Sequence, residues 1–78
     1  KTDMTIFPNP ADRSLNLTMD GVKSADIKIL DIKGQIYFQG VLNGTSMEIP
    51  IDMIPNGTYF LQVVTTDEQV ITKKFVKQ

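Results

Sequence analysis

The chain has 78 residues, a formal net charge of −1 from 8 basic and 9 acidic side chains, and neither cysteine nor histidine. The length allows a single small domain, and the balanced charge argues against nucleic acid as a partner, because phosphate binding needs a basic face. Without histidine or cysteine the chain lacks the usual general base and thiolate of an enzyme and the usual ligands of zinc. We therefore predict a non-catalytic domain without a cofactor.

The first segment predicts a short strand that ends abruptly. Residues 1–3 are polar, and because Lys1 is not a start methionine we expect them to be a residual linker within a longer protein. Residues 4–7 predict a strand that stops at Pro8 and Pro10, since a proline has no N–H to donate to a ladder. We therefore expect an extended piece at the edge of a sheet.

The next two predicted strands differ in how regularly they alternate. Residues 14–19 alternate strictly between apolar and polar side chains, as in an antiparallel strand with one buried face. Residues 25–32 alternate until Leu30 and Ile32, which fall on the outward face. Either this strand is buried on both faces at its end or a bulge resets its register, and the sequence leaves both interpretations open.

The middle of the chain predicts a hairpin with a tight turn. Residues 31–34 read as the turn, in which Gly34 takes a positive φ. Residues 35–42 predict the returning strand, with Tyr37 on its outward face. Gly40 within this strand indicates a bulge or a close backbone approach.

The last strands carry their own edge and turn signals. Residues 45–51 predict a strand, and Pro50 assigns it to the edge of a sheet. Residues 56–78 predict a hairpin with a polar tip at 65–68. Because successive side chains of a strand point to opposite faces, the first arm can bury Tyr59, Leu61 and Val63 together.

These segments together predict the fold class. Short strands with turn signals about every ten residues, and no helical period, are typical of an all-β domain. Each strand carries one apolar face, which suits two sheets packed face to face. We predict a seven-stranded antiparallel Ig-like β-sandwich, with strand order left open.

The basic end of the chain is the candidate functional segment, and two interpretations of it are equally supported. The lysines either protect an edge strand against aggregation, or they form a recognition tag that docks into an acidic, partly apolar groove. In both cases we expect the segment to add little to the core. Its residues are Lys73, Lys74, Phe75, Val76, Lys77 and Gln78.

The ordered motifs along the chain resemble a known family, the type A C-terminal sorting domains of the type IX (Por) secretion system. The resemblance rests on IFPNPA at 6–11, LNL at 15–17, ILDIKGQI at 29–36, GTYFLQV at 57–63 and KKFVK at 73–77. In this family the signature positions would correspond here to Pro8, Asn9, Pro10, Asp31, Gly34, Gly57, Tyr59 and the basic end.

The resemblance implies a function that the residues alone do not give. It implies that residues 1–78 are one C-terminal targeting domain that sends an N-terminal cargo to the cell surface or medium. The implied partners are the outer-membrane translocon with its shuttle protein and a surface sortase that removes the domain. The alternative is an Ig-like accessory module that binds glycan or protein through outward aromatic residues such as Tyr37 and Phe60.

Overall fold

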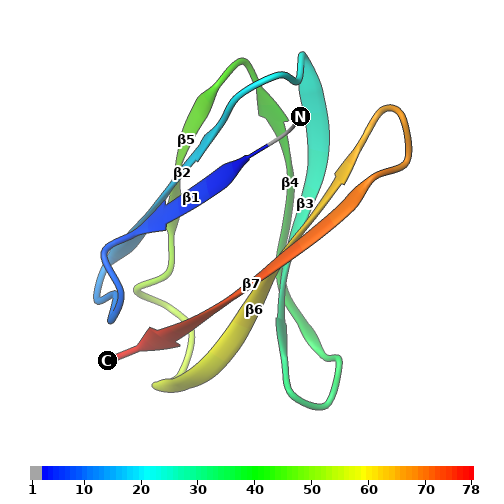
Figure 1. Ribbon diagram of the computed structural model, residues 1–78. Coiled ribbons are helices and arrows are strands. Elements are labelled where there is room, and N and C mark those ends of the chain that lie inside the picture. Colours follow the sequence, from blue (N-terminus) through cyan, green and yellow to red (C-terminus); the bar gives the residue numbers. More distant parts are fainter. Residues whose placement is uncertain (1–2) are drawn as a thin grey trace.

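The computed structural model describes residues 3–78, and it contains seven β-strands in two antiparallel sheets (Figure 1). The predicted all-β fold is confirmed. Within the described residues, no helix has the length and apolar character needed to span a bilayer. The strands are β1 (Met4–Phe7), β2 (Ser14–Met19), β3 (Ser24–Asp31), β4 (Ile36–Asn43), β5 (Ser46–Pro50), β6 (Gly57–Thr65) and β7 (Val70–Lys77).

The two sheets differ in size. The smaller has the strand order β1-β2-β5, and the larger has the order β4-β3-β6-β7. Strands β1 and β5 therefore lie at edges, as the prolines beside and within them predict. Of the expected linker, residues 1 and 2 lie outside the described residues, whereas the Asp3 carbonyl accepts a hydrogen bond from the Asp20 amide at 3.3 Å.

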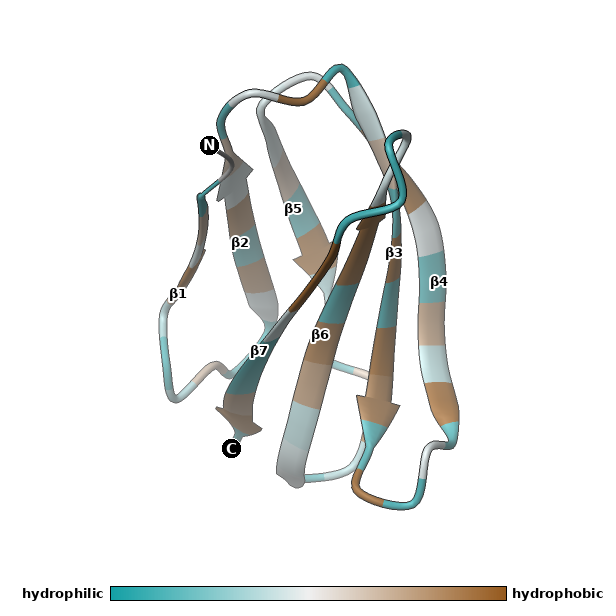
Figure 2. Ribbon diagram, turned by 45° about the vertical axis from the view of Figure 1, so that its right-hand side comes forward, coloured by the Kyte–Doolittle hydropathy of each residue, from teal (hydrophilic) through white to brown (hydrophobic). Residues whose placement is uncertain are grey.

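The core lies between the sheets and follows the predicted alternation, which Figure 2 shows as bands of apolar and polar colour along the strands. The residues predicted to face inward on β2 and β6 are buried. The largest fully buried side chains are Leu15, Leu17, Met19, Ile27, Ile29, Leu42, Ile49, Ile51, Leu61, Val63 and Phe75.

A bulge explains the broken alternation at the end of β3. Ile29 pairs with Phe38 but Leu30 pairs with Ile36, so Tyr37 is the extra residue and the bulge lies in β4. Tyr37 packs against the core instead of facing outward. The prediction of an outward Tyr37 is therefore wrong, because a bulge shifts the face of the residues around it.

The glycine within β4 marks a close approach and not the bulge itself. A Cβ atom at Gly40 would lie 3.2 Å from the ring of Phe38, closer than ordinary van der Waals contact. The missing side chain thus leaves room for the Phe38 ring to lie along its own strand.

Strand β7 contributes more to the core than its lysines suggest. Phe75 is fully buried, and Lys77 is 7% exposed. The expectation that residues 73–78 add little to the core is therefore wrong. Phe75 pairs with Tyr59 of the neighbouring strand β6, and this register places both rings between the sheets.

Candidate functional site

The motif segments gather at one end of the sandwich, which we call the base. It consists of residues 8–13, 32–35 and 51–56 together with Gln78, and it is the lower end in Figure 1. The first described residues lie at the opposite end, which we call the apex (Figure 1). The alternating strand directions place segments from both halves of the chain at the base.

The proline-rich segment holds the end of β7. The Ala11 amide donates to the Val76 carbonyl and the Gln78 amide donates to the Ala11 carbonyl, each at 2.8 Å. The Val76 amide donates to Oδ1 of Asn9 at 3.1 Å, so a side-chain oxygen takes the place of a strand carbonyl. We call these contacts the terminal bridge. It continues the edge of β7 toward the loop that follows β1.

The Asp31 side chain builds the turn between β3 and β4. Its Oδ1 accepts the amides of Lys33 and Gln35, each at 2.9 Å, and its carbonyl accepts the Gly34 amide at 3.0 Å. Gly34 has a φ of +88°, as predicted, in the region where a side chain is unfavourable. The carboxylate of Asp31 is thus engaged in turn structure, which is the usual reason for aspartate in such a place.

Tyr59 joins the base to the core. Its hydroxyl donates to the Pro55 carbonyl at 2.6 Å, which fixes the loop between β5 and β6. Its ring meets Tyr37 edge-on at a centroid distance of 5.3 Å and stacks on Phe75 at 5.8 Å. Burial, and to a lesser extent the neighbouring Tyr37 and Asp31, raises the pKa of Tyr59 above its ordinary value.

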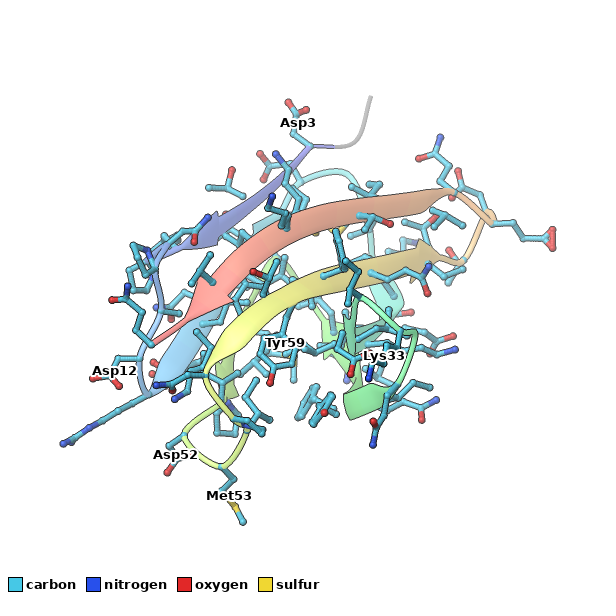
Figure 3. All side chains as sticks on the ribbon, turned by 90° about the horizontal axis from the view of Figure 1, so that it is seen from below. Asp3, Asp12, Lys33, Asp52, Met53 and Tyr59 are labelled. Carbon is cyan, nitrogen blue, oxygen red and sulfur yellow. The ribbon has the colours of Figure 1, made fainter. Side chains whose placement is uncertain are left out.

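The view onto the base shows how its loops surround this tyrosine (Figure 3). Asp12, Asp52 and Met53 project outward from their loops, and Lys33 lies on the other side of Tyr59 (Figure 3). Met53 is 92% exposed, so the loop presents an apolar tip.

Lys77 occupies an inward position and still finds polar partners. Its Nζ donates to Oδ1 of Asn56 at 3.4 Å and to the Gln78 carbonyl at 3.3 Å. Its aliphatic stem is buried while the ammonium reaches the polar rim of the base, which is the usual behaviour of lysine at such a boundary. No local sequence pattern indicates that Asn56 contacts Lys77.

The structure separates the predicted recognition residues into buried and accessible ones. Lys73, Lys74 and Gln78 are exposed, and Val76 is half-buried. Phe75 lies in the core and cannot enter a receptor groove while the domain is folded. The predicted segment therefore does not present a continuous surface.

The motif positions of the base have structural roles among the described residues. Within residues 3–78, no three acidic side chains come together to hold a metal ion. The titratable residue with a shifted pKa is Tyr59, whose hydroxyl is already bonded to a backbone carbonyl. The motif positions instead build turns and join distant segments.

Comparison with known proteins supports this interpretation. Residues 5–78 match the family model described as "Secretion system C-terminal sorting domain". The chain is also 25% identical over 76 residues to an endo-acting ulvan lyase from Formosa agariphila. That alignment covers 96% of this chain and 15% of the lyase, so the chain spans a small part of that relative.

Proposed function

The chain belongs to the family of secretion system C-terminal sorting domains, and from this premise we propose that it is read as an export signal by the type IX translocon and its shuttle protein. Membership implies a targeting domain without catalytic activity and export across the outer membrane to the cell surface or medium. The observation that carries the proposal is the family match over residues 5–78, almost the whole chain.

We further propose that residues 1–78 act as one domain attached to an N-terminal cargo and that a surface sortase removes them after export. The described part of the chain begins at the apex, away from the base (Figure 1). A cargo attached there would leave the base and the end of β7 accessible. The match to the ulvan lyase supports a secreted enzyme as the kind of cargo, since such domains are joined to larger proteins.

A fusion experiment tests this function. A folded periplasmic reporter is joined to the N-terminus of residues 1–78 and expressed in a bacterium with a type IX system. We expect the reporter in the medium or on the surface of this host, and in the periplasm of a host that lacks the translocon. A reporter that stays in the periplasm of both hosts, although the domain is folded, would contradict the proposal.

Deletion of the basic end is not a suitable probe of recognition. Removing residues 73–78 would take Phe75 from the core, where loss of a large aromatic side chain costs about 3–5 kcal/mol. A small domain has only about 5–15 kcal/mol of stability, so the deletion would report unfolding. Substitution of the exposed Lys74 preserves the core and isolates recognition.

A further inference from the structure

The outer face of the larger sheet carries a row of mostly apolar side chains that do not belong to the core. Ile36 on β4 pairs with Leu30 on β3, Leu30 pairs with Phe60 on β6, and Phe60 pairs with Lys74 on β7. Paired residues share a face, so the four side chains form one row, about 14 Å long at a strand spacing of about 4.8 Å. We call this row, which lies near the base, the outer strip.

The outer strip is accessible. Ile36 is 45% exposed, Lys74 is exposed, and Leu30 and Phe60 are half-buried. The outward face of a sheet that packs with only one side on the core normally carries polar side chains. Ile32, in the turn just below Leu30 and Ile36, is 82% exposed. An apolar row next to an exposed isoleucine is the kind of patch that marks an interaction site.

The charged side chains nearest the outer strip on the sheet face are lysines, while Asp31, next to Leu30, has its carboxylate bonded to two amides of the turn. Lys74 ends the row, and Lys28 stands in the neighbouring row between Gln39 and Gln62. Asp26 stands one row further away, between Val41 and Val64. A partner that covers the strip along the sheet would therefore meet the ammonium groups of Lys74 and Lys28 before it meets the carboxylate of Asp26.

The surface beside the outer strip is hollowed. A depression of about 450 Å³ lies over the next two rows and is lined by residues of β3, β4 and β6, with Lys28 on the side nearer the strip and Asp26 on the far side. A concave, partly apolar surface suits a raised segment with apolar side chains, and Lys28 and Lys74 on the side nearest the strip favour carboxylates at the flank of that segment.

We propose that the outer strip is the surface through which the export machinery recognises the folded domain, and that the partner protein presents an apolar segment flanked by acidic side chains. This inference rests on the proposed function and names the contact surface for it. The strip combines residues 30, 36, 60 and 74 from separate strands, so it exists only when the sheet is formed. The outer strip also explains how the basic end could take part in recognition although Phe75 is buried. Within that end, Lys74 faces outward beside Phe60.

The test uses the reporter fusion in a type IX host. The double variant Ile36→Thr, Lys74→Glu removes one apolar contact and reverses one charge, and threonine keeps the β-branched shape that suits a strand. We expect the exported fraction to fall about tenfold, and Lys74→Arg alone to be exported like the unchanged domain. Thermal unfolding of the purified domains must agree within a few degrees, so that the loss reports recognition.

Two matched controls accompany this variant. Val70→Thr lies on the outward face of β7, is 58% exposed, and lines neither the outer strip nor the depression. Lys23→Glu reverses an exposed charge at the apex. Both are expected to be exported normally. Normal export of the double variant, with its fold intact, would overturn the inference and leave the proposed function in place. If the unchanged fusion is not exported, both the inference and the proposed function are overturned.

Two further measurements test whether a membrane or a second copy of the domain, and not a partner protein, covers the outer strip. Binding of the purified domain to phosphatidylglycerol vesicles that is lost in the double variant would assign the strip to a membrane and overturn a protein partner. A dimer in sedimentation equilibrium that dissociates in the double variant would assign it to a second copy and likewise overturn the inference. The inference is supported if the purified domain is a monomer that does not bind the vesicles and the double variant is exported poorly.

Discussion

At the level of single residues, Tyr59 joins the loop between β5 and β6 to the core. Its burial could be predicted, because the alternation of β6 places it on the apolar face. Its aromatic neighbour Tyr37 could not, because the bulge that turns this residue inward depends on how two strands pair. The outward position of Phe60 followed from the same alternation of β6. The exposed position of Ile36 in the same row could not be predicted, because it depends on the bulge beside it.

The raised pKa of Tyr59 predicts how stability changes at high pH. A group with a higher pKa in the folded state binds its proton more tightly there, so its contribution to stability is complete below about pH 10 and is lost as pH rises toward the folded-state pKa. Tyr59→Phe removes this titration and the bond to Pro55, which costs about 1 kcal/mol at neutral pH.

Urea unfolding at several pH values from neutral to alkaline measures both effects. We expect the difference between the unchanged domain and Tyr59→Phe to shrink above about pH 10. Tyr37→Phe is the control, because it removes the neighbouring hydroxyl and leaves the bond to Pro55 in place. A difference that stays constant across this range would show that ionisation of Tyr59 does not affect folding.

At the level of elements, the terminal bridge is the feature that is hardest to predict from the sequence. The seven strands, the turn at Gly34 and the edge positions of β1 and β5 follow from local patterns. The pairing of Ala11 with Lys77 does not, because contacts between residues so far apart leave no periodic signal. The basic end was therefore expected to add little to the core, although Phe75 and Lys77 are buried.

Substitution of Asn9 tests the terminal bridge. Asn9→Ala removes the acceptor for the Val76 amide, which should lower local stability by about 1 kcal/mol and speed exchange of that amide about fivefold. The Phe75 amide belongs to the ladder with β6 and should change less. Amide hydrogen exchange followed by NMR makes the comparison.

Asn9→Asp is the matched variant, since it keeps an oxygen acceptor of the same size. We expect near-normal exchange at Val76 in this variant. Equal exchange in all three proteins would show that the side chain of Asn9 contributes nothing to the order of the chain end.

At the level of the whole molecule, the two ends of the sandwich have different roles. The base collects the motif segments, whereas the apex holds the start of the described chain and the tip of the β6–β7 hairpin (Figure 1). The fold class followed from the sequence, but this division did not, because it depends on strand directions and on the order of strands within two sheets.

Insertions at the two ends test this division. A short Gly-Ser insertion between Asp67 and Glu68 at the apex should leave export unchanged, because exposed loop tips tolerate added residues. The same insertion between Asp52 and Met53 at the base should leave the fold intact but lower export severalfold. Circular dichroism and the reporter assay measure the two effects, and equal export of both proteins would contradict separate roles for the ends.

The terminal bridge also makes the domain sensitive to the order in which its chain is delivered. Asn9 and Val76 are 67 positions apart, so a chain that is synthesised or threaded from its N-terminus presents the first partner long before the second. Until the last residues arrive, Ala11 has no strand to pair with and Tyr59 has no Phe75 to stack on. A chain interrupted or clipped before β7 would thus stay open, and closure of the domain reports that β7 has been made.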